Sequence, residues 1–350
     1  MNIAVIGAGV IGVSSAVAVQ KAFPKSRVSI FADVFTPDTT GDGSAGLWGP
    51  FIIGDTPVTE FTRYGGATHR WLEHFWKRGL AQEIGLSLIP VIRVRRGEGF
   101  AMPEWKSEVY GAAELSQEEL KKLSDEHKTN YRGGMRFVTY TVEPARLLPW
   151  LMKKFAAAGG IIQKMKINSF DELAKKGYDT VINCSGIGAR ELASDTSLLP
   201  VRGDDSSERI DVFQVEAPWA LGVFIEEDSP GNYIIPNIET VIIGGTATPN
   251  DYDTNIRATE TNFILKGCSR ISPALEDSKV VKHWCGLRPK RTKIRVEKET
   301  RSTEDGKIFE VIHNYGHGGA GVTVFWGCAL RVVEILREST LDPKSQSSKL

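Results

Sequence analysis

The sequence predicts an α/β protein in which a parallel sheet is interleaved with a second domain built on a mixed antiparallel sheet. Residues 2–31 have the order strand, helix, strand, which is the βαβ unit of a parallel sheet. Residues 208–248 alternate apolar and polar side chains in short runs, as strands with one buried face do. Because no low-complexity linker separates these textures, we expect two domains that share the chain in several pieces.

The first βαβ unit follows from local patterns. Residues 2–6 form a short apolar run that predicts a buried strand, and residues 27–31 predict a second one. Between them, residues 10–23 carry apolar side chains at helical spacing, and Pro24 ends the helix.

Three later segments complete the first domain. A helix opens at Pro144 and runs to about Ala158, and Pro149 inside it predicts a kink or a broken start. Residues 178–183 predict a buried strand, and residues 321–336 predict a long helix near the C-terminus.

The domain boundaries follow from these elements and from the strand-like pieces and polar turns of residues 85–138. We expect the first domain at residues 1–50, 140–205 and 280–338, and the second at 51–139 and 206–279. Residues 339–350 are polar, and we expect them to form a flexible tail.

Composition excludes several classes of protein. The chain has 350 residues, 41% of them apolar and 25% charged, which is typical of a globular protein and argues against general disorder. Lys+Arg and Asp+Glu both number 43, so the basic surplus of a nucleic-acid binder is missing. No apolar run approaches the roughly 18 residues of a membrane-spanning helix, and the N-terminus has no secretory signal pattern.

The cysteines suggest neither a disulfide framework nor a zinc site, because no two of them form a Cys-x-x-Cys pair. We therefore expect reduced, mostly buried thiols in an intracellular protein. The residues are Cys184, Cys268, Cys285 and Cys328.

A dinucleotide fingerprint lies in the first turn. The run Gly7-Ala8-Gly9-Val10-Ile11-Gly12 fits Gly-x-Gly-x-x-Gly, follows a strand and opens a helix. The first glycine permits the tight turn, the second lets backbone N–H groups approach a pyrophosphate, and the third lets the helix pack on the strand. Asp33, at the end of the next strand, is placed to accept a hydrogen bond from a ribose hydroxyl. The fingerprint alone fits NAD or FAD.

A second glycine-rich segment, His313 to Thr323, precedes the predicted C-terminal helix and favours FAD, because amides at a helix N-terminus can face a flavin ring. His313 and His317 lie in this segment without a cluster of carboxylates or cysteines. We therefore expect no metal site, and histidines held by backbone contacts instead.

Several motifs together resemble one family. In their order along the chain they are similar to those of the FAD-dependent D-amino-acid oxidases, a family that includes the D-aspartate oxidases. The matching pieces are Gly7 to Gly12, Phe35 to Thr40, Ala45 to Trp48, Val181 to Gly186, Val201 to Gly203, Gly286 to Pro289, and His313 to Thr323 with Trp326-Gly327.

The resemblance implies FAD as cofactor and assigns its contacts residue by residue. Asp33 matches the ribose-binding acid, and Ile167 matches a position bound through its backbone. The third of three consecutive family threonines is Gly41 here, so that contact is lost or made by backbone. The full implied set is Gly7, Ala8, Gly9, Val10, Ile11, Gly12, Asp33, Thr39, Thr40, Gly46, Leu47, Ile167, Gly318 and Thr323.

The resemblance also implies the substrate contacts. Arg288 matches the residue that binds the substrate carboxylate, for which a planar guanidinium offers two parallel donors. Tyr233 matches a tyrosine that hydrogen-bonds the same carboxylate, and the carbonyl of Gly319 matches the acceptor of the amine. The family needs no catalytic side-chain base, because hydride passes from Cα to the flavin. The products would be a 2-oxo acid, ammonia and, with oxygen as acceptor, hydrogen peroxide.

The sequence departs from the family at the substrate site. Ser229 stands where mammalian D-amino-acid oxidases carry a second tyrosine, on a lid that is several residues shorter here. The two side-chain arginines of the D-aspartate oxidases are replaced by Glu226 and Ala247. The acidic insertion Asp204 to Glu208 has no assigned role. The substrate-site residues thus place the chain closer to the D-amino-acid oxidases.

The sequence as a whole predicts an oxidase of neutral or basic D-amino acids, with Glu226 attracting basic side chains. The alternative is a D-aspartate oxidase that uses another cation, such as Arg291 or Lys290. Other rivals are a flavin-binding protein without turnover and an NAD-linked dehydrogenase.

The terminal Ser348-Lys349-Leu350 matches the peroxisomal address, so we expect an import receptor as a partner and the peroxisomal matrix as location. Beyond the receptor and the small molecules, we expect no nucleic-acid or membrane partner, and a homodimer stays open.

Overall fold

The computed structural model describes residues 1–198, 208–228, 230–246, 248–249, 253 and 255–341. Several sequence-based expectations lie outside the described residues. They concern the Val201 to Gly203 motif, residues 204–207 of the acidic insertion, Ser229, Ala247 and the terminal Ser348-Lys349-Leu350.

The expected parallel sheet is present, and we call it the first sheet. Among the described residues its strand order is β14-β15-β7-β1-β2-β6. All neighbours are parallel except β14, which pairs antiparallel with β15. The strands are β1 (Asn2–Ile6), β2 (Arg27–Ala32), β6 (Ile161–Lys164), β7 (Thr180–Asn183), β14 (Lys290–Ser302) and β15 (Ile308–His317).

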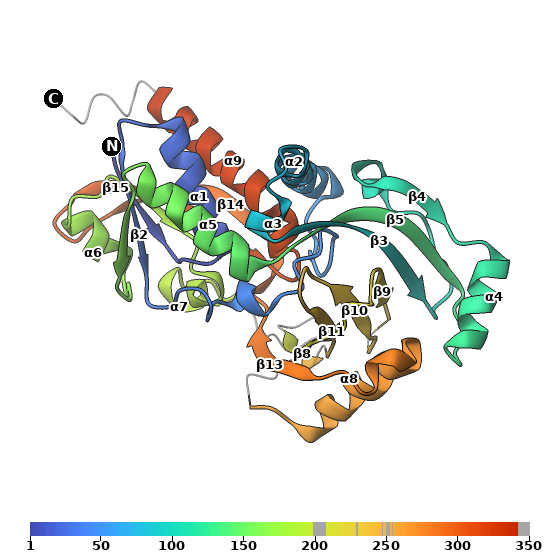
Figure 1. The fold of residues 1–350 in the computed structure, drawn as a ribbon. Helices are drawn as coiled ribbons and strands as arrows, with labels where there is room; N and C mark the ends of the chain where they lie inside the picture. The colour runs from blue at the N-terminus through green and yellow to red at the C-terminus, as the bar shows by residue number, and fades with distance from the viewer. Residues whose placement is uncertain (199–207, 229, 247, 250–252, 254, 342–350) are drawn as a thin grey trace.

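Helices cover both faces of the first sheet (Figure 1). Ile3 and Val5 of β1 point to the face covered by α1 (Val10–Ala22), α5 (Pro144–Ala157) and α9 (Gly321–Leu341). Ala4 and Ile6 point to the opposite face, where α6 (Phe170–Lys175) packs. Burial on both faces explains why β1 is apolar from Ile3 to Ile6, without the alternation of half-exposed strands.

A second sheet carries the remaining strands in the order β12-β8-β11-β10-β9-β3-β5-β4, with β13 pairing to the other side of β8. These strands are β3 (Leu86–Arg95), β4 (Tyr110–Glu114), β5 (Gly133–Val142), β8 (Glu208–Val215), β9 (Val223–Glu226), β10 (Tyr233–Pro236), β11 (Val241–Gly244), β12 (Thr248–Pro249) and β13 (Val280–Leu287). The helix α8 (Ala258–Ile271) packs against β8 and β11 on the face away from the first domain (Figure 1). The mixed antiparallel sheet expected from residues 208–248 is confirmed.

Four details differ from the expected organisation. The strand β13 lies in the second sheet, so the last return to the first domain comes after Leu287 and not at residue 280. The helix α2 (Val58–Lys77) packs on α9 of the first domain, although it falls within the expected second domain. The helix α5 is continuous across Pro149, so its start is not broken. The helix α9 continues to Leu341, three residues into the expected tail.

The remaining helices are short, apart from α4 (Gln117–Glu126) beside the second sheet. They are α3 (Ala81–Ile84) and α7 (Ala189–Leu192), with 3₁₀ turns at Thr40–Gly43, Glu104–Glu108, Gly186–Gly188 and Pro273–Leu275.

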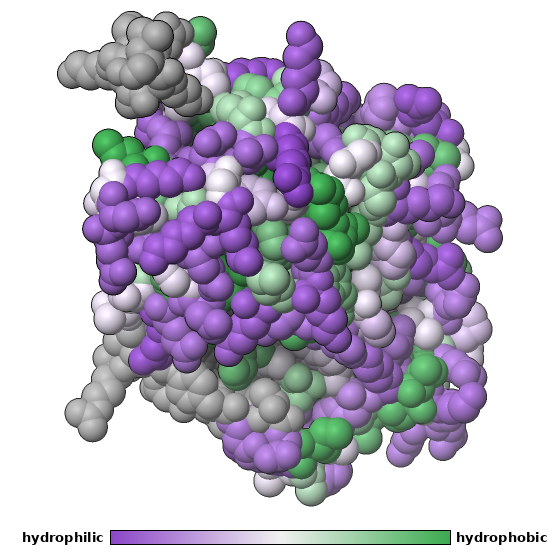
Figure 2. Space-filling view, turned by 90° about the vertical axis from the view of Figure 1, so that its left-hand side faces the viewer, coloured by the Kyte–Doolittle hydropathy of each residue, from purple (hydrophilic) through white to green (hydrophobic). Residues whose placement is uncertain are grey.

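One face of the molecule is mainly hydrophilic, and the cysteines are mostly buried, as the sequence predicts for them. Hydrophilic side chains dominate the face shown in Figure 2, with small hydrophobic patches between them. Within the described part of the chain, no helix combines the length and apolar character needed to span a bilayer. Cys184, Cys268 and Cys328 are buried thiols, as predicted. Burial raises the pKa of the Cys184 thiol to about 12, which keeps it protonated.

Candidate active site

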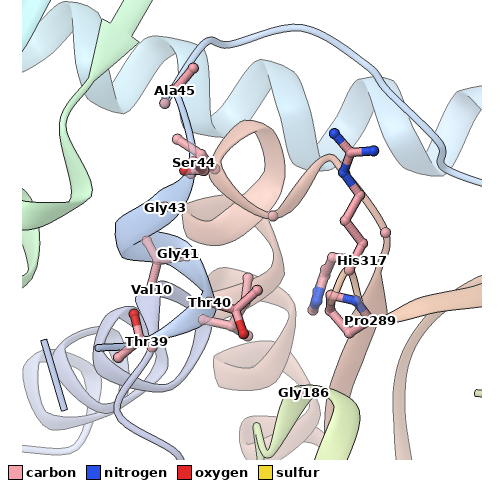
Figure 3. Close-up of a pocket in the computed structure, with 18 of the residues that line it drawn as sticks. Val10, Thr39, Thr40, Gly41, Gly43, Ser44, Ala45, Gly186, Pro289 and His317 are labelled. Atoms are coloured by element: carbon pink, nitrogen blue, oxygen red, sulfur yellow. The ribbon is translucent and has the colours of Figure 1, made fainter. Parts of the chain in front are cut away.

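A cavity of about 550 Å³ runs between the two sheets, from the Gly7 turn to Arg288 and Tyr233. Segments far apart in the sequence surround it (Figure 3). Val10 comes from the start of α1, and the labelled residues between Thr39 and Ala45 come from the segment after β2. Pro289 lies in the turn between β13 and β14, and His317 is the last residue of β15. The cavity therefore joins the predicted dinucleotide turn to the predicted substrate residues.

Two glycines of the turn are required by contacts within the protein, and the third leaves space for a ligand. Gly7 has φ +103°, and a Cβ there would lie 2.4 Å from the carbonyl oxygen of Cys184. A Cβ on Gly12 would lie 2.0 Å from the carbonyl oxygen of Gly7, so this glycine lets α1 pack on the turn. A Cβ on Gly9 would meet no other protein atom within 4 Å. Gly9 lines the cavity, so the open space beside it serves a ligand and not the packing of the chain.

The loop after β2 is held by a residue that the motif search did not find. Asp42 accepts hydrogen bonds from Thr39 N at 2.9 Å, Thr39 Oγ1 at 2.6 Å and Thr36 Oγ1 at 2.7 Å. These contacts fix Thr39 and Thr40 at the cavity wall, where Asp33 also lies. Thr39 and Asp42 form a capping box, and their spacing of three residues could have indicated the role of Asp42 from the sequence.

The remaining predicted cofactor residues divide into two groups. Gly46, Leu47 and Gly318 line the cavity together with Ala8, Val10 and Ile11.

Three others lie behind the cavity wall. Thr323 Oγ1 donates to Gly49 O at 2.8 Å and accepts from Gly49 N at 3.1 Å, so it supports a lining residue. Ile167 belongs to the apolar cluster under α6, and Gly12 packs on the glycine turn. Neither is among the described residues that line the cavity.

The other end of the cavity holds Arg288 and Tyr233. The Arg288 guanidinium carbon lies 4.7 Å from the centre of the Phe51 ring, and the residue is 8% exposed. Tyr233 on β10 pairs with Gly244 on β11, and its ring lies against Gly244-Gly245, where added Cβ atoms would come within 2.4 and 2.6 Å of it. Burial raises the pKa of Tyr233, opposed by Arg288, so the phenol is a neutral donor at physiological pH.

The glycine-rich loop closes this end. Gly319 lines the cavity, and a Cβ there would lie 2.6 Å from Phe51 Cδ1. Burial lowers the pKa of His317 to about 3, so its ring is neutral, and Nε2 lies 3.2 Å from Asn314 Oδ1. His313 contacts Glu299, with 2.8 Å between Nε2 and Oε2. Side chains therefore hold both histidines, and not the backbone contacts we predicted.

Glu226 does not face the substrate, so its predicted role is wrong. On β9, Ile225 points into the cavity, and Glu226, one residue on, points to the opposite face toward α8. There it accepts hydrogen bonds from Arg270 Nη2 at 2.6 Å and Tyr131 OH at 2.7 Å, with its side chain 1% exposed. Burial raises the pKa of Glu226, but these two donors outweigh burial and bring it below the ordinary value.

The cation proposed for the alternative function is also engaged elsewhere. Arg291 Nε donates to Asp195 Oδ2 at 2.9 Å, and Tyr315 OH donates to the same oxygen at 2.7 Å. Neither Arg291 nor Lys290 is among the described residues that line the cavity. Arg93 of β3 does line the cavity. The sequence did not reveal this, because the strand-like pattern of residues 85–138 does not show which face of the sheet each side chain takes.

The chain matches the family described as "DAO: FAD dependent oxidoreductase" over residues 2–335. It belongs to this family of FAD-dependent oxidoreductases. It is 35% identical over 338 residues to the human D-aspartate oxidase, covering 96% of this chain and 95% of that protein. It is 34% identical over 350 residues to the D-amino acid oxidase of Dugesia ryukyuensis, covering 98% and 100%. The two relatives are equally similar, so identity does not place the chain closer to one group.

Solved structures agree on the fold. Glycine oxidase from Geobacillus kaustophilus superimposes with a TM-score of 0.72 at 18% identity, covering 96% of this chain and 94% of that one. L-proline dehydrogenase from P. horikoshii superimposes with a TM-score of 0.70 at 14% identity, covering 96% of this chain and 93% of that one.

The residues of the cavity fit FAD. The glycine turn leaves open space beside Gly9, and the N-terminus of α1 presents backbone amides to a pyrophosphate there. Asp33 lies at the same end, where a ribose would bind. Gly46 and Leu47 line the same cavity as Arg288, and the resemblance places them beside the flavin ring.

Proposed function

We propose that the protein oxidises free D-amino acids with bound FAD. The observation that carries the proposal is a single cavity with the dinucleotide turn at one end and, at the other, buried Arg288 and partly buried Tyr233. A cofactor that spans this length would bring its reactive ring next to a carboxylate-binding arginine. The D-amino-acid and D-aspartate oxidases among the relatives point to the same substrate class.

The side chains of this site bind and orient the substrate. The guanidinium of Arg288 donates two parallel hydrogen bonds to the α-carboxylate, and the neutral Tyr233 hydroxyl donates a third. The backbone carbonyl of Gly319 accepts a hydrogen bond from the amine. Fixing both groups aims Cα–H at the cofactor, so positioning supplies most of the rate. When bound, FAD supplies the hydride acceptor.

We propose oxygen as the final acceptor, with hydrogen peroxide as product. The imino acid, once released into water, would hydrolyse to a 2-oxo acid and ammonia. Because the resemblance assigns no side-chain base, the ammonium group of the substrate would lose its proton to water before hydride transfer, and the carbonyl of Gly319 would then accept a hydrogen bond from the neutral amine.

The expected preference for basic side chains loses its support, because Glu226 is paired with Arg270 on the other face of the sheet. Neutral substrates such as D-alanine remain part of the proposal, because Arg288 and Tyr233 contact only groups common to all amino acids. Which side chains are favoured depends on other residues, considered below.

Peroxide release across a panel of free D- and L-amino acids tests the proposal. We expect turnover with several D-amino acids and little with their L-enantiomers. Anaerobic addition of D-alanine should bleach the flavin absorbance, whereas a flavin-binding protein without turnover would show a stable spectrum. An NAD-linked dehydrogenase would instead be purified without flavin absorbance.

We also propose import into the peroxisomal matrix through Ser348-Lys349-Leu350. Removing these residues should move a fluorescent fusion to the cytosol and leave catalysis unchanged. A truncated protein that still reached peroxisomes would refute this address.

A further inference from the structure

A second cavity of about 240 Å³ adjoins the substrate end of the first one. Pro50, Phe51 and Arg93 line both cavities, so the two share a wall. Arg95, Trp105 and Glu227 belong to the second cavity alone among the described residues. The motifs of the sequence assign no function to this space.

Arg93 lies close to Tyr233 across the second sheet. On the neighbouring strands, Arg93 of β3 pairs with Ile225 of β9, and Ile225 pairs with Tyr233 of β10. These residues form a lateral row on one face, and all three line the first cavity. Adjacent strands are about 4.8 Å apart, so Arg93 and Tyr233 are separated by roughly 10 Å in the backbone. A substrate held at Tyr233 would lie between the two residues, within the reach of a long arginine side chain.

The charge near the substrate is positive. Among the described residues, the acidic side chains that line the first cavity are Asp33 and Asp38, both in the cofactor-binding segment after β2. At the substrate end stand two arginines, Arg288 and Arg93. One of them suffices for the α-carboxylate, which leaves the second for another anionic group.

Arg93 has donor capacity to spare. It forms an ion pair with Glu227 and lies 5.5 Å from the centre of the Trp105 ring. Its Nε is buried and has no hydrogen-bond partner among the described residues, and the same holds for Nε of Arg95. Burial lowers the pKa of Arg93, opposed by Glu227, so a second anion nearby would relieve a cost of burying this charge.

Resting on the function proposed above, we propose that Arg93 is the residue that determines side-chain specificity, by binding the side-chain carboxylate of an acidic D-amino acid. Arg288 and Arg93 would then hold the two carboxylates of one substrate. The second cavity gives room for side chains longer than that of D-aspartate. Glu227, directly after β9, is the positioning partner that holds the Arg93 guanidinium through their ion pair.

The variant Arg93→Met tests this assignment, because methionine keeps an unbranched chain and removes the charge. We expect kcat/KM for D-aspartate to fall about 100-fold or more, as when a buried charge pair loses one member. For D-alanine we expect a change of less than about threefold. The matched control is Arg136→Met on the adjacent strand β5, whose arginine is exposed and paired with Glu119, and it should change neither value.

Two outcomes would overturn the assignment. An equal loss on both substrates would show that Arg93 only holds β3 to β9 through Glu227. An unchanged D-aspartate value, or a wild-type enzyme that oxidises D-alanine but not D-aspartate, would show that no side-chain carboxylate reaches Arg93.

A binding measurement on the unmodified holoenzyme supports the same conclusion without turnover. Malonate and propionate have three carbons each, with two carboxylates and one, respectively. We expect malonate to perturb the flavin spectrum at concentrations at least about tenfold lower than propionate, which is about 1.4 kcal/mol. Equal binding would overturn the role of Arg93. If no D-amino acid is oxidised but malonate is preferred, the proposed function fails while the second anion site stands.

Discussion

The two ends of the main cavity are built from different materials. At the cofactor end, backbone atoms form the wall, and Gly7, Gly9 and Gly12 are needed for turns and close approaches. At the substrate end, side chains of the second sheet form the wall, with Arg93 and Tyr233 projecting from its strands and Arg288 following β13. A backbone wall imposes glycines at fixed spacing, whereas a side-chain wall depends on which face each strand residue takes.

Adding a methyl group to the backbone wall tests this difference most strongly. In Gly12→Ala the new Cβ would lie 2.0 Å from the Gly7 carbonyl oxygen, so we expect several kcal/mol of destabilisation and loss of bound FAD. In Gly9→Ala no protein atom is touched, so the apoprotein should keep its melting temperature and lose FAD affinity about tenfold or more. Thermal melting of apoprotein and FAD titration separate the two. Equal effects of both variants would contradict the distinction.

A substitution at the substrate end should lower activity without lowering FAD binding. Arg288→Leu removes the bidentate carboxylate contact, so we expect kcat/KM on D-alanine to fall about 1,000-fold while FAD stays bound. Steady-state kinetics and flavin absorbance measure the two effects. Near-normal efficiency on D-alanine would show that the carboxylate binds elsewhere.

Glu226 tests how far the side-chain wall depends on strand orientation, because its neighbour Ile225 lines the cavity and Glu226 does not. Glu226→Gln should leave substrate preference unchanged and lower the free energy of unfolding by about 1–3 kcal/mol, since Arg270 loses its charged partner. Denaturant unfolding and the ratio of D-arginine to D-alanine turnover give the readouts. A changed ratio with unchanged stability would restore the original prediction for this residue.

A smaller effect is expected at His69 of α2, which packs against Trp48 and Tyr140 away from both ends. Burial lowers its pKa to about 4, and its Nε2 has no hydrogen-bond partner among the described residues. The unfolded chain therefore takes up a proton below about pH 6.5 that the folded one does not, so this contribution to stability falls as pH drops from 6.5 to 4.

His69→Phe removes this titration. We expect the variant to be more stable than the wild type at pH 5 by at most about 2 kcal/mol, with a smaller difference at pH 8. Denaturant unfolding at the two pH values measures it. A difference that did not change with pH would show that His69 is not neutral in the folded state.

The contrast between the two ends also explains what could be predicted. The glycine turn, Asp33 and the βαβ unit were predictable because local spacing determines them. Glu226 was misplaced because its orientation depends on the register of β9 between β3 and β10, which no local pattern reveals. Arg93 and Phe51 were missed for the same reason, since each acts through residues far away in the sequence.

The strand order of the first sheet has a consequence for how the protein is made. The strand β1 lies between β2 and β7, and β7 is completed on its other side only by β15. About 300 residues separate β1 from β15, which at 5–20 residues per second is roughly 15–60 s of synthesis. The strands β2, β6 and β7 are made well before then, but β7 lacks one neighbour until β15 is made, and the face of β1 that α9 covers stays open until α9 follows. We therefore expect the nascent chain to be prone to aggregation until β15 and α9 have left the ribosome.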